Sequence, residues 1–90
     1  MSRYLVERSF TDGLAITADD DGAIALREVV EGNAEHGVTW VHSYVSPDRT
    51  ATFCICDGPS PEAIRMAAET TGLPVNRIIE VRVLDPYFYH

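Results

Sequence analysis

The chain has 90 residues with seven arginines, no lysine and 14 acidic side chains, which gives a net charge of −7. That length predicts one domain, and so acidic a balance argues against nucleic acid and anionic membrane surfaces as main partners. No apolar run reaches the ~18–20 residues of a membrane span, and the first residues lack the apolar region of a signal peptide, so we expect a cytoplasmic protein.

The first half of the chain predicts a strand, a helix and a hairpin. Residues 3–9 alternate in hydropathy and favour a strand, and residues 10–17 favour a loop. Three aspartates at 19–21 suit the start of a helix, which Gly37 ends. Residues 38–46 are rich in β-branched and aromatic side chains, and a turn at 46–49 leads into a returning strand over residues 50–57.

The second half adds a helix and a strand. Ser60 fits the N-cap and Pro61 the first helical position, and Gly72 ends the helix. Residues 77–84 predict a last strand, which is followed by an aromatic tail. The order βαββαβ predicts an α+β, ferredoxin-like fold, in which a four-stranded antiparallel sheet carries both helices on one face. An uncovered sheet face in so short a chain favours a homodimer.

Alternation along each strand predicts which side chains face the helices. We place the more hydrophobic set inward, which leaves aromatic and ligand-type side chains on the open face. The inward set is Tyr4, Val6, Val41, Ser43, Val45, Phe53, Ile55, Ile79, Val81 and Val83. The open-face set is Leu5, Glu7, Trp40, His42, Tyr44, Thr52, Cys54, Cys56, Glu80 and Arg82.

The register of the hairpin decides this assignment. A two-residue turn at Pro47 and Asp48 pairs His42 with Phe53, which contradicts the inward set. A three-residue loop or a bulge pairs His42 with Cys54 instead and agrees with it. A slip of one residue would move the whole set to the other face.

A metal site is the sharpest candidate on the open face. Imidazole and thiolate bind nickel, copper and zinc, and the carboxylate of Glu7 can complete a set with His42, Cys54 and Cys56. In the alternative interpretation, His42 is a hydrogen-bonded interface residue and the cysteines are small apolar fillers. The two thiols lie two residues apart on one strand, with Cβ atoms roughly 6–7 Å apart, so a disulfide between them is disfavoured.

Two other histidines are candidate surface ligands. His36 lies in the last turn of the first helix, where a cation also suits the helix dipole. His90 is the final residue, and its ring and carboxylate could chelate a metal. Either could act with Glu35 or with acidic groups of a partner chain.

Non-metal functions stay open as alternatives. His42 and Cys54 could be a base and a nucleophile in a cofactor-independent enzyme. Trp40, Tyr44 and the tail aromatics could wall a pocket for a small hydrophobic molecule on the open face of a dimer. Glu80 with Arg82 fits a cross-strand ion pair better than a catalytic pair.

Four strings together resemble a family of small bacterial proteins that is catalogued as a domain of unknown function and whose described member binds nickel. They are residues 4–8 (YLVER), 37–44 (GVTWVHSY), 52–55 (TFCI) and 60–65 (SPEAIR). The resemblance implies a ferredoxin-like homodimer that holds Ni²⁺, or another divalent transition metal, partly at the dimer surface. It implies nickel sequestration or detoxification without catalysis, and it carries Glu7, Trp40, His42 and Cys54 over as site candidates.

Overall fold

The computed structural model describes residues 1–16 and 19–87. Its elements follow the predicted order βαββαβ. Strand β1 spans Ser2–Ser9, helix α1 spans Asp20–Ala34, and the hairpin consists of β2 (Thr39–Val45) and β3 (Ala51–Gly58). Helix α2 (Pro61–Thr71) and strand β4 (Arg77–Val81) complete the chain.

The predicted helix signals act as expected. The Asp19 side chain accepts a hydrogen bond from the Gly22 amide at the start of α1, and Ser60 accepts one from Ala63 at the start of α2. Gly72 ends α2 with a φ of 74°, a left-handed conformation that glycine adopts without strain. Among the described residues, no helix has the length and hydrophobicity needed to cross a membrane.

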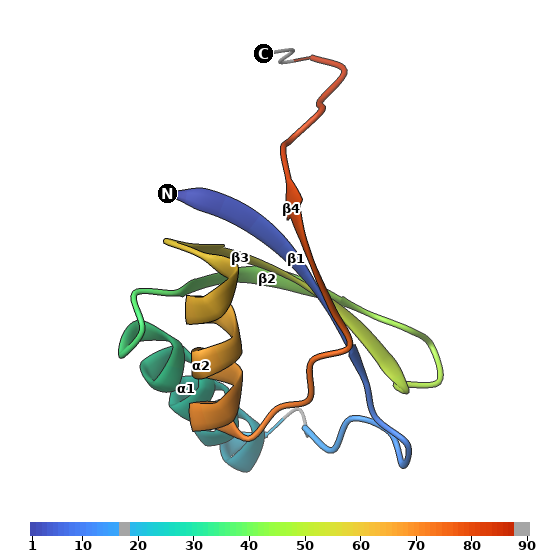
Figure 1. Cartoon of the computed structure of the whole chain (residues 1–90). Helices are drawn as coiled ribbons and strands as arrows, with labels where there is room; N and C mark the ends of the chain where they lie inside the picture. The colour runs from blue at the N-terminus through green and yellow to red at the C-terminus, as the bar shows by residue number, and fades with distance from the viewer. Residues whose placement is uncertain (17–18, 88–90) are drawn as a thin grey trace.

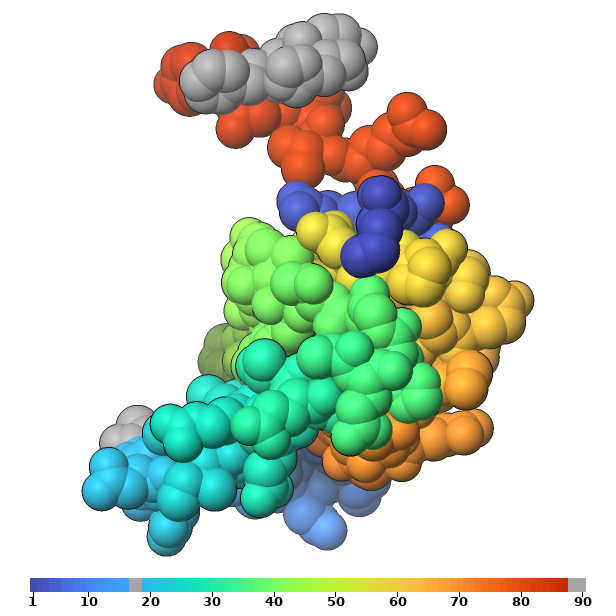
Figure 2. All heavy atoms as spheres, turned by 90° about the vertical axis from the view of Figure 1, so that its left-hand side faces the viewer, coloured from blue at the N-terminus to red at the C-terminus, as the bar shows by residue number. Residues whose placement is uncertain are grey.

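The four antiparallel strands form one sheet in the order β2-β3-β1-β4, with both helices on the same side (Figure 1). This confirms the predicted ferredoxin-like arrangement. The last strand is shorter than expected and ends at Val81 rather than at residue 84. Residues 82–87 instead extend away from the body of the molecule (Figures 1 and 2).

Both predicted registers of the hairpin are wrong. The Ser46 amide donates to the Ala51 carbonyl at 3.0 Å and closes a four-residue turn over 47–50. His42 therefore pairs with Ile55 rather than with Phe53 or Cys54. A bulge between Trp40 and His42 then shifts the register, so that Trp40 pairs with Cys56. A bulge adds one residue to one strand, so Trp40 and His42 point to opposite faces although they are two residues apart.

Arg49 connects the turn of the hairpin to a segment far away in the sequence. Its φ of 63° is unusual for a residue other than glycine. In that conformation its guanidinium donates hydrogen bonds to the carbonyls of Leu14 (3.1 Å) and Ile16 (2.7 Å). The turn is thereby fastened to the segment between β1 and α1.

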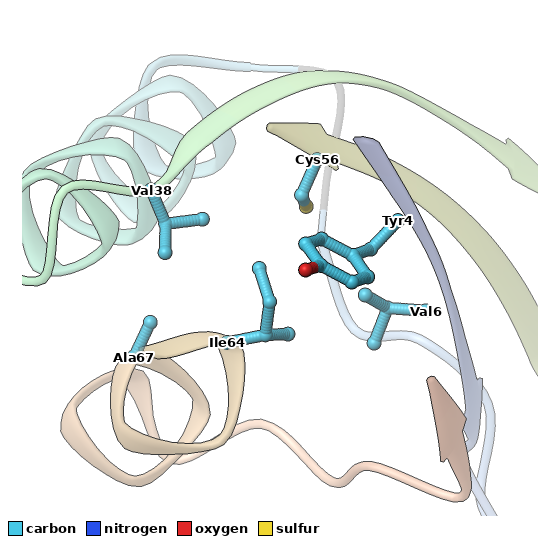
Figure 3. Close-up of a cluster of buried hydrophobic side chains, with 6 residues drawn as sticks. All are labelled: Tyr4, Val6, Val38, Cys56, Ile64 and Ala67. Carbon is cyan, nitrogen blue, oxygen red and sulfur yellow. The ribbon is translucent and has the colours of Figure 1, made fainter. Parts of the chain in front are cut away.

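The core lies between the sheet and the helices (Figure 3). Tyr4 and Val6 of β1 and Cys56 of β3 point towards Ile64 and Ala67 of α2. The helices also approach each other closely, since a Cβ added to Gly32 would lie 2.8 Å from Thr71 Cγ2. Few side chains are fully buried, as expected for a domain of this size.

Candidate functional site

The open face is the sheet surface that the helices leave uncovered. The register places there an apolar cluster, together with His42, Tyr44 and four charged residues. The open-face residues are Arg3, Leu5, Glu7, Thr39, His42, Tyr44, Phe53, Ile55, Asp57, Arg77, Ile79 and Val81. The open-face prediction is confirmed for Leu5, Glu7, His42 and Tyr44. Four residues that were expected to face the helices lie on the open face instead: Phe53, Ile55, Ile79 and Val81.

The register also corrects the opposite set. Cys54 pairs with Val6, and Cys56 pairs with Tyr4 and Trp40, so all of these side chains lie on the helix side of the sheet. Thr52 lies on that side as well, paired with Arg8. The prediction ranked the thiols below Phe and Ile as core residues. On the helix side Cys56 belongs to the buried core and Cys54 packs against it, so the thiols act there as small apolar side chains.

His42 lies on the open face of the sheet. It is exposed, and its ring packs edge-on against that of Tyr44 with 5.2 Å between the centroids. Cys54 lies on the other face, so the expected set of His42, Cys54 and Glu7 does not converge within one chain. The described residues contain no group of three His, Cys, Asp or Glu side chains that could hold a metal ion.

The charged residues of the open face are paired. Arg3 binds Asp57 through two hydrogen bonds of 2.8 and 3.0 Å, and these hold the pKa of the Asp57 carboxyl below its usual value. Arg77 Nε lies 3.6 Å from Glu7 Oε2, a looser contact. These two acids and two bases cancel, so the net charge of −7 resides elsewhere on the chain.

Cys56 is a poor metal ligand in this arrangement. Cys56 is 3% exposed, and burial raises its pKa to about 11. Metals bind the thiolate, which that burial disfavours. Cys54 is half-buried, and its Sγ lies 3.8 Å from Thr52 Oγ1.

The remaining candidates are dispersed. Trp40 lies on the helix side, where its Nε1 donates to Ser43 Oγ at 2.8 Å, so the expected aromatic basin with Tyr44 does not form within one chain. Glu80 pairs with Tyr4 and therefore does not lie on the open face, and Arg82 follows the end of β4. His36 Nε2 lies 2.7 Å from Thr70 Oγ1 on the helix layer. His90 lies outside the described residues.

Sequence reasoning missed a buried polar cluster on the helix side. Arg8, Asn33 and Thr52 are each at most 5% exposed, and all three line one cavity beneath α1. The signal was present in β1, where Arg8 continues the inward alternation of Tyr4 and Val6. That alternation predicts a buried guanidinium, which is rare without a paired charge.

Comparisons with known proteins agree with this fold. The model of a family described as nickel responsive protein SCO4226-like matches residues 4–81. Among solved structures, the crystal structure of SCO4226 from Streptomyces coelicolor A3(2) is similar, with a TM-score of 0.73 and 19% identity over 93% of this chain and 100% of that chain. At that identity the likeness establishes the fold alone. A search of curated proteins found no match.

Proposed function

Because this chain belongs to the SCO4226-like family of nickel-responsive proteins, we propose that it binds and sequesters Ni²⁺, without catalysis, as a cytoplasmic homodimer. Another divalent transition metal could take the place of nickel, since the affinity of one site for divalent first-row metals rises along the series to Cu²⁺. The observation that carries the proposal is the exposed imidazole of His42 on an uncovered, largely apolar sheet face.

The composition of the open face supports a second copy of the chain as its partner. Leu5, Ile55 and Ile79 lie side by side across three strands, in register with His42. The charges of the face cancel, so contact between two copies adds no like-charge repulsion at the interface, and the net charge of −7 lies outside it. A two-fold dimer presents the same patch from both subunits.

Pairing of two copies would also supply the missing ligands. Within one chain, His42 on β2 and Glu7 on β1 are separated by β3. Across a two-fold interface, His42 of one copy can act with a carboxylate or imidazole of the other. Such a site uses nitrogen and oxygen ligands, which suit nickel. The revised ligand set is therefore His42 with Glu7, and Cys54 is removed from it. His36 is a separate surface candidate.

Native mass spectrometry of untagged protein tests this proposal. We expect a dimer that takes up a fixed whole number of Ni²⁺ ions, and fewer ions in His42→Ala and Glu7→Gln. Cys54→Ser is the matched control and retains the full number. Uptake weakens as pH falls, because protons compete for the ligands.

Three results would contradict the proposal. A monomer would remove the shared site, and uptake only at large excess would make the metal incidental. Loss of uptake in Cys54→Ser alone would return the site to the helix side. Parallel titrations with Zn²⁺ and Cu²⁺ establish which ion the site prefers.

A further inference from the structure

The cavity beneath α1 contains a feature that the proposed metal function does not use. Arg8 is 5% exposed and its Nη1 donates to the Pro74 carbonyl at 2.7 Å. Its Nε is buried and has no hydrogen-bond acceptor among the described residues. Neither ion pair found among those residues involves Arg8. A buried guanidinium is costly unless a negative charge and hydrogen bonds compensate it.

The cavity around Arg8 has the composition of a ligand site. Its volume is about 50 Å³, above the ~10–15 Å³ that one water needs. Thr52 and Asn33 join Arg8 in an otherwise mostly apolar wall that includes Trp40 and Cys54. All three polar or charged residues that are buried among the described ones therefore converge on this space. Convergent polar groups in an apolar cavity are typical of small-molecule sites.

The cavity adjoins a larger groove that opens towards solvent. Phe10, Leu14, Ile16, Val29 and Leu73 line both spaces. The groove has a volume of about 450 Å³, which lies in the usual range of ligand sites. None of its lining residues is fully buried, whereas the cavity is lined by buried Arg8, Asn33, Thr52 and Cys56. The positive charge is thus at the inner end and the apolar passage leads outward.

We propose that this cavity binds a small monocarboxylic acid with an apolar tail. The carboxylate accepts hydrogen bonds from Arg8, including the one that Nε lacks, and Thr52 stands beside it. The tail runs outward between Leu14, Val29 and Leu73. The opposite orientation is unfavourable, because the groove's acidic lining residue, Glu28, would then face the carboxylate, and Arg8 would keep its unpaired donor.

The charge of the protein is consistent with a buried rather than a surface site. A chain of −7 repels anions at long range. A pair formed inside the protein is screened much less by salt and water than a pair at the surface. The site therefore selects an acid by its apolar tail as well as by its charge, and inorganic anions, which have no such tail, bind to it more weakly.

Trp40 provides a direct assay, since it is the one tryptophan of the sequence and it lines the cavity. We would titrate metal-free protein with hexanoate and with 1-hexanol, which share a chain length but differ in charge. We expect saturable changes in Trp40 fluorescence and about tenfold or more tighter binding of hexanoate, because charge-assisted hydrogen bonds are stronger than neutral ones. In NMR spectra, hexanoate shifts the Arg8 Nε–H resonance.

Arg8→Met tests the role of the guanidinium, and Arg65→Met on the exposed surface of α2 is its matched control. We expect Arg8→Met to bind hexanoate and hexanol alike, and Arg65→Met to keep the preference of the wild type. Bound hexanoate also slows modification of Cys54, which lines the same cavity.

The comparison of two ligands on the wild-type protein stands even if Arg8→Met does not fold. Equal affinity for the acid and the alcohol would overturn the proposal. So would phosphate that binds as tightly as hexanoate, or the absence of saturable binding. Because the assay uses metal-free protein, its result is independent of nickel binding.

Discussion

The thiol of Cys56 offers a quantitative test of the face assignment that moves both cysteines away from the proposed metal site. Its pKa is raised to about 11 by burial. At pH 8 this gives a thiolate fraction of ~0.001, against ~0.2 for an ordinary cysteine with a pKa of ≈8.5. Thiolates of higher pKa are intrinsically more nucleophilic, which restores about a factor of ten.

The net expectation is a rate at least about twentyfold below that of an unhindered thiol, with further slowing because the side chain is 3% exposed. The assay uses Cys54→Ser, so that Cys56 is the thiol observed, and an aromatic disulfide reagent at pH 8. The same variant unfolded in denaturant gives the reference rate. As pH rises from 7 to 10, the rate in the folded protein increases about tenfold per unit, because the thiolate fraction does so below the pKa.

Two results would refute this reasoning. A folded-state rate equal to the unfolded rate would mean that Cys56 is not buried against Tyr4 and Ile64. Slowing of the reaction by Ni²⁺ would mean that the thiol is a metal ligand after all. Cys56→Ser provides the corresponding measurement for Cys54, and we expect no effect of Ni²⁺ there either.

Three further predictions concern packing, assembly and pH. Gly32→Ala destabilises the protein by about 1–2 kcal/mol in urea unfolding, because overpacking against Thr71 exceeds the gain in helix propensity. The double variant Gly32→Ala with Thr71→Ser restores or exceeds wild-type stability. A single variant as stable as the wild type would argue against the close helix contact. In light scattering, Ile79→Glu on the open face yields a monomer, whereas Ile24→Glu at an exposed position of α1 stays dimeric. If both variants stay dimeric, the open face is not the interface. Hydrogen bonds from Ser46 and Thr50 lower the pKa of Asp48 to about 2. The stabilisation of the folded state by Asp48 is therefore complete above its unfolded pKa of 3.8 and is lost as pH falls towards 2. The melting temperature of Asp48→Asn should converge with that of the wild type at low pH, and a constant difference would contradict this.

The fold was predictable because its signals are local. The Ser60-Pro61 start and the Gly72 end of α2 each depend on a backbone conformation that few residues satisfy. Strand faces depend instead on one-residue details of register. The bulge at Val41 and the four-residue turn held by Arg49 are set by contacts with distant segments, and no composition rule places them. The open face therefore came out partly wrong, although each strand was located.

The positions of the cysteines show why hydrophobicity alone misled the assignment. Ranking Phe53 and Ile55 above Cys54 and Cys56 is sound for a sheet with one wet face. It fails where the other face is also apolar, as it is here around Leu5 and Ile79. Arg8 was the better indicator, since it shares the inward alternation of Tyr4 and Val6 and pairs with Thr52 on the thiol side.

Strand β1 separates two kinds of chemistry by alternation. Leu5 and Glu7 face the surface proposed for the second copy and the metal, and Val6 and Arg8 face the cavity. A domain of 90 residues has a total stability of only about 5–13 kcal/mol. A buried charge without a full set of partners costs several kcal/mol, a large share of that total. Replacing Arg8 by an apolar residue of similar length would remove this cost, so a purely structural role gives little reason for a guanidinium here. A ligand that brings a carboxylate supplies that reason, because it converts the largest electrostatic liability of the core into a source of binding energy.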